Sequence, residues 1–301
     1  LAISGYSREE ALDGLNVPPD RVVNVSTAIG PEFQEKRIDQ DEASLLSARL
    51  NLQRPFILYT GGADERKNLP RLIEAWSALP VSLRNTHQLL FAGRMPEGNV
   101  AELQRIAGRC GLGKDELVFS GYVSDEELVL LYNLCKLFVF PSWHEGFGLP
   151  ALEAMACGAP VIGANTTSVP EVIGLEEALF DPFDTAAIRD KLQAALGDEE
   201  FLARLRSHGS EQAQLFSWDA TAQRAIAAWH DSLAKNSSAE TESPNLIQVL
   251  AGKLGSYDDS QLAKLAGDLA QNEASGIERQ LMLDISELCQ HDAASGVQRV
   301  V

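Results

Sequence analysis

Apolar runs that stop at glycine or proline alternate with stretches of helical period along the chain. Each run is short enough to be a strand that is buried on both faces. The five clearest runs are residues 56–59, 87–92, 117–119, 138–140 and 161–162. Strands that alternate with helices in this way predict an open α/β sheet, which binds ligands at the carboxyl ends of its strands.

Several predicted helices are marked by a cap or by an apolar face. Pro70 suits the first turn of one helix, and Ser124 with Glu127 forms a capping box at the start of another. The apolar face of the first helix holds Leu72, Ile73, Trp76 and Leu79. A longer helical period covers about four turns and contains Trp218, Ala222, Ala225, Ile226, Trp229 and Leu233.

The first residues predict a smaller unit that ends where the main sheet begins. Residues 1–4 are expected to be the end of a strand, and residues 21–25 a second short strand. Between them, Ser7 and Glu10 form a capping box for a short helix that ends near Gly14.

Residues 138–158 are the stretch around which the chain is organised, because they combine a strand, a glycine-rich loop and a helix. Pro150 suits the first turn of that helix. Glycines let backbone N–H groups approach a ligand, and a helix N-terminus favours anionic or oxygen-rich groups. Glu145 in the loop and Glu153 one turn inside the helix could address two parts of one bound molecule. For an isolated pair, two solvated carboxylates would be the simpler interpretation.

A second glycine-bearing loop, residues 60–68, follows the first predicted strand. Its glycines, Gly61 and Gly62, would expose backbone amides at the carboxyl end of that strand. Arg66 and Lys67 come next, and together they could clamp a diphosphate, the guanidinium as a fork and the ammonium as a point charge. Taken alone, the two cations could equally be a solvated cluster.

Two other ligand classes fit the sequence poorly. A dinucleotide-binding turn needs three spaced glycines and an acidic residue after the next strand, but here the next strand ends in Gly93 and Arg94. Asp181 and Asp184 flank Pro-Phe, and this spacing indicates a turn more than a metal site.

Composition narrows the class of partner. The chain has 301 residues, a formal net charge of −18 and 45% hydrophobic residues. That leaves room for about two domains, and the negative charge argues against a nucleic-acid partner. The four cysteines, Cys110, Cys135, Cys157 and Cys289, lack zinc-site spacing and are expected to be buried, reduced thiols of a cytosolic protein. No apolar stretch is long enough to span a bilayer, and the start at Leu1 indicates a fragment.

The stretch from Glu145 to Val172 resembles the signature of a known enzyme family. It contains E-G-F-G-L-P-x-L-E-A-M-A-x-G-x-P-V-I and continues to Ser168-Val-Pro-Glu-Val. This is similar to the family-four retaining glycosyltransferases, whose GT-B architecture has two facing Rossmann-like domains. The resemblance implies a doubly wound, Rossmann-like parallel sheet with flanking helices. It also implies that this chain is the C-terminal, donor-binding half of such an enzyme.

The resemblance also assigns roles to residues. It implies that Glu145, Arg66 and Lys67 are catalytic, that Glu153 holds the ribose, and that no metal or other cofactor is required. The backbone at Tyr122 and Val123 would face the base. The remaining donor contacts would be made by Gly61, Gly62, Gly146, Phe147, Gly148 and Leu149. Many members carry arginine directly after the first glycine, where this chain has Gly62, so this chain departs from the family pattern at that point of the phosphate site.

Further resemblances extend along the chain and predict its domain organisation. Ser295-Gly-Val-Gln-Arg is similar to the opening of the acceptor-side domain in family-four mannosyltransferases, which implies two transferase modules in tandem. The expected parts are the end of an acceptor-side domain with its connection at 1–54, the donor domain at 55–217, a crossover helix at 218–235, a linker at 236–245, a helical segment at 246–277, and the start of the next transferase domain at 278–301.

The function implied by the resemblance is transfer of a sugar from a nucleotide diphosphate donor to a glycan or lipid-linked glycan acceptor, as in surface polysaccharide synthesis. GDP-mannose is the favoured donor, and a UDP-glucose type is the alternative. A non-catalytic nucleotide-sugar-binding or docking module is a third interpretation. The protein is expected in the cytoplasm or at the inner face of a membrane, and this chain alone is expected to bind nucleotide without turnover, because the acceptor half lies elsewhere.

Overall fold

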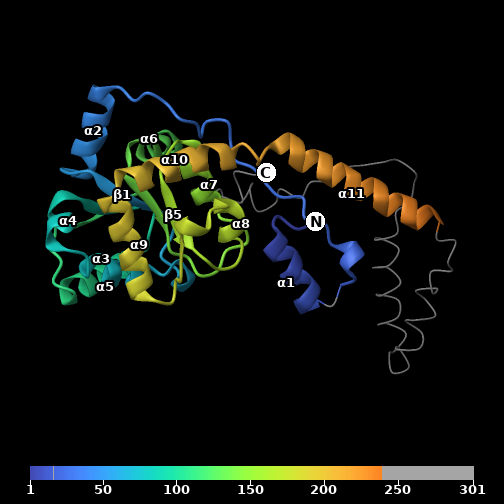
Figure 1. Ribbon diagram of the computed structural model, residues 1–301, viewed down its shortest axis with the longest axis horizontal. Coiled ribbons are helices and arrows are strands. Elements are labelled where there is room, and N and C mark those ends of the chain that lie inside the picture. The colour runs from blue at the N-terminus through green and yellow to red at the C-terminus, as the bar shows by residue number, and fades with distance from the viewer. Residues whose placement is uncertain (16, 239–301) are drawn as a thin grey trace, which may run out of the picture. The chain divides into compact units, whose positions relative to one another are not determined.

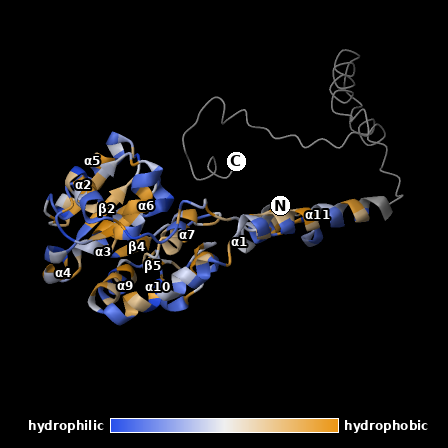
Figure 2. Ribbon diagram, turned by 90° about the horizontal axis from the view of Figure 1, so that it is seen from above, coloured by the Kyte–Doolittle hydropathy of each residue, from blue (hydrophilic) through white to orange (hydrophobic). Residues whose placement is uncertain are grey.

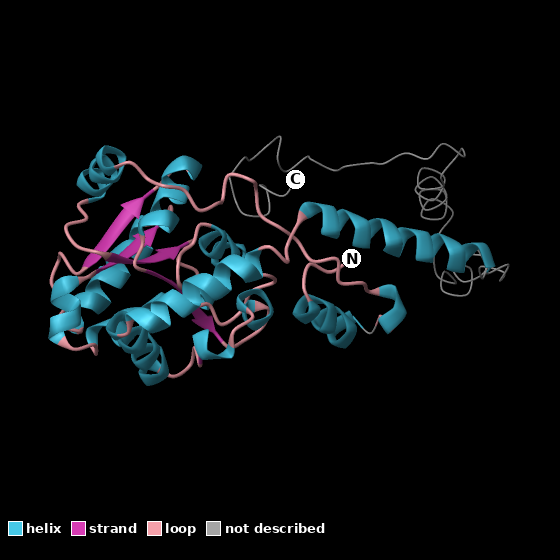
Figure 3. Cartoon of the chain, turned by 45° about the horizontal axis from the view of Figure 1, so that its top comes forward, coloured by secondary structure: helices cyan, strands magenta, loops and turns pink. Residues whose placement is uncertain are grey.

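The computed structural model describes residues 1–15 and 17–238 (Figure 1). The chain divides into two units, Leu1–Ala227 and Ala228–Val301. The first unit contains an α/β domain built on one sheet, with helices around the strands (Figure 3). This confirms the predicted Rossmann-like fold class.

The sheet has six parallel strands in the order β3-β2-β1-β4-β5-β6. They are β1 (Phe56–Thr60), β2 (Gln88–Ala92), β3 (Leu117–Gly121), β4 (Leu137–Phe140), β5 (Val161–Ala164) and β6 (Leu179–Phe180). The chain runs outward from β1 in one direction and from β4 in the other. The strand order therefore reverses between β1 and β4, where doubly wound sheets bind their ligands.

All five predicted strands are confirmed, with ends that differ by one or two residues. Every residue of β1, β2, β4 and β5 is buried, which explains why these strands are continuous apolar runs and not alternating ones. Strand β6 was not predicted, because two residues are too few to carry a pattern.

The helices follow from the strand order. Right-handed crossovers place α3 and α5 on one face of the sheet and α7 and α8 on the other. Helix α9 packs beside α3, and α10 packs on α7. The bounds are α2 (Gln40–Leu50), α3 (Leu69–Ser77), α4 (Val81–Thr86), α5 (Glu97–Arg109), α6 (Asp125–Leu134), α7 (Leu149–Ala156), α8 (Val169–Ile173), α9 (Thr185–Gly197) and α10 (Glu199–Ala213).

The core lies between the sheet and these helices, and Figure 2 shows apolar residues gathered around β2, β4 and β5. The predicted apolar face of α3 is confirmed, since Leu72, Ile73 and Trp76 are fully buried and Leu79, just beyond the helix, is also buried. Burying such side chains stabilises the domain by roughly 1.5–3 kcal/mol each, which is enough to fix α3 and the loop that precedes it.

The predicted capping box of α6 is confirmed. The hydroxyl of Ser124 accepts a hydrogen bond from the backbone N–H of Glu127 over 3.3 Å, and the Glu127 carboxylate accepts from the N–H of Ser124 over 3.0 Å. Two N–H groups that the helix cannot satisfy by itself are thereby paired.

Replacing Ser124 by alanine is expected to lower the free energy of unfolding by about 1 kcal/mol, because one cap bond is lost. Urea unfolding followed by circular dichroism measures this. Ser44→Ala is the matched control, since Ser44 lies on an exposed face of α2 and its hydroxyl, within the described part of the chain, bonds only to the carbonyl of Gln40. Equal losses in the two variants would contradict a specific role for the cap.

The first residues differ from the prediction. Helix α1 (Gly5–Leu15) begins before Ser7, and the Ser4 hydroxyl accepts from the N–H of Ser7 over 2.9 Å. The capping box of Ser7 and Glu10 is therefore wrong, because the chain enters the helix three residues earlier. The two predicted strands are also wrong, since residues 1–4 and 21–25 share only the isolated bridge between Ala2 and Asn24.

Helix α11 (Trp218–Ser238) covers the long period expected near residue 218. The Trp218 indole N–H donates to the carbonyl of Ile29 over 3.0 Å, within the first unit. The helix continues to Ser238, so it takes in the first residues of the predicted linker. The rest of that linker and the segments at 246–277 and 278–301 lie outside the described residues. None of the described helices is both long and apolar enough to cross a membrane.

Three of the four cysteines lie in the described part of the chain, and all three are free thiols. Cys135 and Cys157 are buried as predicted, whereas Cys110 is half-buried. Burial disfavours the charged thiolate and raises the pKa of Cys157 to about 12, and it raises the pKa of Cys135 as well. The two buried cysteines are therefore expected to be unreactive at neutral pH.

Candidate active site

The loops after β1 and β4 are joined at the carboxyl edge of the sheet. The backbone N–H of Trp143 donates to the carbonyl of Arg66 over 3.0 Å. The buried side chain of Asn68 donates to the carbonyl of Pro141 over 3.1 Å. Asn68 itself has a φ of 61°, a left-handed conformation that asparagine adopts more readily than most residues. The two loops therefore form one site at the point where the strand order reverses.

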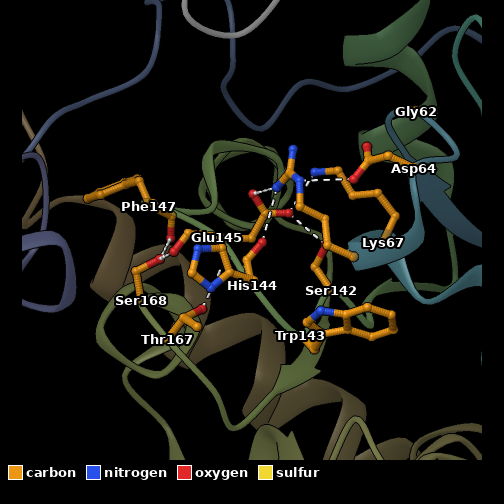
Figure 4. A network of polar contacts seen from close by, with 12 residues as sticks. Gly62, Asp64, Lys67, Ser142, Trp143, His144, Glu145, Phe147, Thr167 and Ser168 are labelled. Atoms are coloured by element: carbon orange, nitrogen blue, oxygen red, sulfur yellow. Dashed lines mark hydrogen bonds and ion pairs between the residues drawn. The ribbon is translucent and has the colours of Figure 1, made fainter. Parts of the chain in front are cut away.

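Glu145 lies at the centre of a buried cluster in this site (Figure 4). Its Oε1 accepts hydrogen bonds from Lys67 Nζ and from the Ser142 hydroxyl, each over 2.6 Å, and its Oε2 pairs with Arg66 over 2.9 Å. The side chains of Glu145 and Lys67 are each 11% exposed. The structure thus brings together the three residues predicted to be catalytic.

The two cations of the cluster are matched by two carboxylates. Arg66 also pairs through Nε with Asp64 over 2.9 Å, so the four formal charges sum to zero. Burial acts to lower the pKa of Arg66, but the neighbouring Glu145 and then Asp64 raise it above its usual value. Within the described residues, Nη2 of Arg66 contacts no carboxylate. That amino group remains available to a ligand.

Tyr59 supports the loop that follows β1, residues 60–68. Its hydroxyl donates to the carbonyl of Gly62 over 2.8 Å. Burial raises the pKa of Tyr59 well above its usual value, and the charges of Glu145 and Asp64 add to this, so the hydroxyl keeps its proton. Gly61 has a φ of +136°, and a Cβ there would meet the Tyr59 hydroxyl at 2.9 Å. Only glycine fits at position 61.

The loop before α7 presents a row of backbone donors. Among the described residues, no protein group accepts a hydrogen bond from the N–H of Gly146, Phe147, Gly148 or Leu149. The Ser168 hydroxyl anchors the loop, because its single proton is shared between the carbonyls of Glu145, over 2.9 Å, and Phe147, over 2.8 Å (Figure 4). Such N–H groups at a helix N-terminus suit anionic or oxygen-rich ligands. The predicted role of these four residues in binding the nucleotide-sugar requires N–H groups that are left unpaired by the protein.

Glu153 is buried on α7, away from the Glu145 cluster. Its Oε2 accepts from the Tyr132 hydroxyl over 2.8 Å, and that hydroxyl lies 2.9 Å from Oγ1 of Thr60 at the end of β1. The carboxylate is thereby held in one orientation beneath the carboxyl edge of the sheet. Its predicted contact with a ribose stays a prediction.

Tyr122 and Val123 lie just beyond β3, at the edge of the sheet. Strand β2 separates β3 from β1, so the two residues are roughly 10 Å from the β1 loop, or two strand spacings. Tyr122 is 68% exposed and Val123 is half-buried. The structure therefore does not bring them into the Glu145 cluster, but they lie on the same edge as that cluster.

A cavity of about 330 Å³ lies beside this site and not over it. It is formed between the first turns of α3 and α5, and Trp143 and Asn68 are among its lining residues. Neither Glu145 nor Lys67 lines it. Since the cavity has no contact with the donors of the glycine loop, the polar cluster is the better candidate for the chemistry.

Several residues of the site were not foreseen as site residues. They are Ser142, Thr167 and Ser168 around Glu145, and Tyr132 beside Glu153. Their role depends on contacts between separate loops, which a spacing within the sequence does not reveal.

Comparison with known proteins agrees with this geometry. Residues 42–212 match the family model described as glycosyl transferases group 1. The chain is 40% identical over 306 residues to the serotype-specific mannosyltransferase WbdA of Escherichia coli, an alignment that covers 100% of this chain and 36% of that protein. It is 35% identical over 233 residues to the O-antigen chain mannosyltransferase B of Escherichia coli, which covers 76% and 59%.

The fold has solved counterparts as well. The sucrose-phosphate synthase from Thermosynechococcus elongatus superimposes with a TM-score of 0.63 at 28% identity, over 78% of this chain and 58% of that one. This chain spans about a third of the length of WbdA. The family match at 42–212 contains the whole sheet and both loops of the site. This chain belongs to the glycosyl transferases group 1 family.

Proposed function

We propose that this chain is the donor-binding part of a retaining mannosyltransferase that takes mannose from GDP-mannose without a metal ion. The observation that carries the proposal is the ion-pair cluster in which buried Glu145 and Lys67 contact each other and half-exposed Arg66 contacts Glu145. This cluster lies on the loops that adjoin the free N–H groups before α7. A purely structural module has no need of paired charges beside unpaired donors. The acceptor is a glycan of a surface polysaccharide, and the names of the two mannosyltransferase relatives support this choice of sugar and product.

The proposed chemistry is electrostatic. The bond between the sugar C1 and the donor phosphate breaks, and an acceptor oxygen forms the new bond to C1 on the same face. The acceptor proton passes to the departing phosphate. Negative charge grows on the diphosphate as it leaves, and fixed cations and N–H groups stabilise that charge without having to reorganise.

The ion pairs of the cluster leave donors for the phosphates. Lys67 has three N–H donors, and its hydrogen bond of 2.6 Å to Glu145 uses one of them. Nη2 of Arg66 is also available. Glu145 therefore keeps both cations in place while their outer donors turn to the diphosphate, and its own carboxylate can accept from sugar hydroxyls.

The remaining donor contacts follow from the same edge of the sheet. Glu153 accepts hydrogen bonds from the ribose, and the backbone at Tyr122 and Val123 faces the base. The acceptor-side domain and a second transferase module belong to the same protein, which acts at the inner face of a membrane. The similarity of residues 295–299 to the opening of an acceptor-side domain supports the tandem arrangement.

Calorimetric titration of this chain with GDP, UDP and ADP in the presence of EDTA tests the proposal. Selective binding of GDP is expected, with no turnover of GDP-mannose by this chain alone. Preference for UDP would support the UDP-glucose alternative. If the intact protein bound none of the three nucleotides and transferred no mannose, a docking module would be the correct interpretation and the proposed function would be wrong.

A further inference from the structure

Every backbone carbonyl from Trp143 to Phe147 lies within hydrogen-bond distance of a side-chain donor. Thr166 donates to Trp143 over 3.0 Å and Arg66 donates to His144 over 3.0 Å, while the single proton of the Ser168 hydroxyl is shared between the carbonyls of Glu145 and Phe147. The Gly146 carbonyl accepts its hydrogen bonds from residues near the start of the chain. The carbonyls of the loop are thus all paired with side chains, while its N–H groups from Gly146 to Leu149 have no acceptor among the described residues and are left for a ligand.

The Gly146 carbonyl is held by two serines near the first residue. The Ser4 hydroxyl donates to it over 2.7 Å and the Ser7 hydroxyl over 3.0 Å, and Ser4 is fully buried. The same segment also reaches α8, because the N–H of Gly5 donates to the Glu171 carboxylate over 2.8 Å. Residues 4–7 are therefore fixed by hydrogen bonds to the glycine-rich loop before α7 and to α8.

The geometry of the peptide bond gives these contacts a consequence. In a planar trans peptide, the C=O and the N–H point in opposite directions. When Ser4 and Ser7 hold the carbonyl of Gly146, they also fix the N–H of Phe147, which belongs to the same peptide, on the opposite side of the loop. We propose that Ser4 and Ser7 are positioning residues, which aim the Phe147 N–H at the sugar of the bound donor.

This inference rests on the proposed function, in which the Glu145 carboxylate accepts from sugar hydroxyls. It adds that the N–H of Phe147 faces the same sugar, while the phosphates are held by Arg66, Lys67 and the other free N–H groups of the loop before α7. A looser Phe147 N–H would then affect the sugar but not the base, the ribose or the phosphates. The two serines should therefore influence use of GDP-mannose and leave affinity for GDP unchanged. A serine that only stabilised the fold would change both quantities together.

The test compares Ser7→Ala, Ser7→Thr and the double variant Ser4→Ala/Ser7→Ala in the intact protein. Ser7→Ala is the cleaner single change, because Ser4 also caps α1. The readouts are kcat/KM for GDP-mannose and the inhibition constant of GDP, and Ser44→Ala is the control. Ser7→Ala is expected to lower kcat/KM about threefold to tenfold, since one neutral hydrogen bond contributes about 1 kcal/mol. The double variant should lose more.

Threonine at position 7 keeps the hydroxyl and is expected to restore most of kcat/KM. Unchanged kcat/KM in the double variant would overturn the inference, and so would an equal loss of GDP affinity. If the unsubstituted protein bound GDP and transferred mannose, either result would contradict only the positioning role of Ser4 and Ser7, and the proposed function would stand. If the unsubstituted protein did neither, the proposed function would itself be wrong, and this inference with it.

Discussion

Replacing Lys67 by methionine is expected to lower the rate of mannose transfer about 10²–10³-fold, because a preorganised donor to the leaving diphosphate is lost. Methionine keeps the approximate length and the apolar stem of the side chain, whose Nζ lies 5.7 Å from the centre of the Phe140 ring. The charge is therefore removed with little change in packing. The measurement is single-turnover transfer from GDP-mannose by the intact protein.

The same change also alters the cluster, and stability has to be measured alongside the rate. Glu145 keeps its contacts with Arg66 and Ser142. The free energy of unfolding should therefore fall by less than the ~3–5 kcal/mol that an orphaned buried charge costs. Urea unfolding checks this and shows whether the variant is folded under assay conditions.

Lys136→Met is the matched control for Lys67→Met. Lys136 forms an ion pair with Glu199, whose side chain is 79% exposed, so the pair contributes little to stability. Neither residue touches the two loops of the site in the described contacts. A transfer rate that fell equally in both variants, or a folded Lys67→Met protein with an unchanged rate, would show that Lys67 has no role in the reaction.

The sequence was most informative where a local pattern fixes the structure. The runs at 56–59 and 138–140 are apolar throughout, because strands buried on both faces leave no polar alternation. Pro150 and Gly148 then mark where α7 begins, and Gly148 has the left-handed φ of 113° that favours glycine. The strand, loop and helix of the central stretch could therefore be predicted from these residues alone.

The pairing within the site could not be predicted in the same way. Lys67 and Glu145 are 78 residues apart in the sequence, and their contact depends on β1 and β4 being neighbours in the sheet. The sequence suggested either a diphosphate or solvent as the partner of the two cations, and the structure shows that they also hold Glu145. The roles of Arg66 and Lys67 in positioning that carboxylate follow from the strand order.

The first helix shows how a local signal can mislead. Ser7 and Glu10 have the spacing of a capping box, yet Ser4 caps the helix and the Ser7 hydroxyl donates to Gly146 instead. Glu10 in turn accepts from the Tyr6 hydroxyl over 3.1 Å. Ser7 cannot cap the helix because it lies inside α1, which begins at Gly5. The contact of the Ser7 hydroxyl with Gly146, in the loop before α7, joins residues 139 positions apart and has no signal within the sequence.

Replacing Glu153 by alanine is expected to weaken GDP binding tenfold or more, because a charge-assisted hydrogen bond to the ribose contributes about 1.5–3 kcal/mol. Calorimetric titration of this chain measures the loss. Comparing GDP with 2′-deoxy-GDP and 3′-deoxy-GDP locates the contact. The unsubstituted chain should bind at least one deoxy nucleotide about tenfold more weakly than GDP, whereas Glu153→Ala should bind all three alike, since the partner of the hydroxyl is gone.

Two further variants separate the ribose contact from packing around Glu153. Glu153→Gln keeps an oxygen that can accept from the Tyr132 hydroxyl, but it lacks the charge that strengthens a bond to the ribose. It should therefore lose part of the GDP affinity while the domain keeps its stability. Glu177→Gln, which removes an exposed carboxylate beside Arg204, should change neither quantity. If Glu153→Ala still distinguished GDP from the deoxy nucleotides as strongly as the unsubstituted chain does, the ribose would be held elsewhere, and Glu153 would serve only to orient Tyr132 and the end of β1.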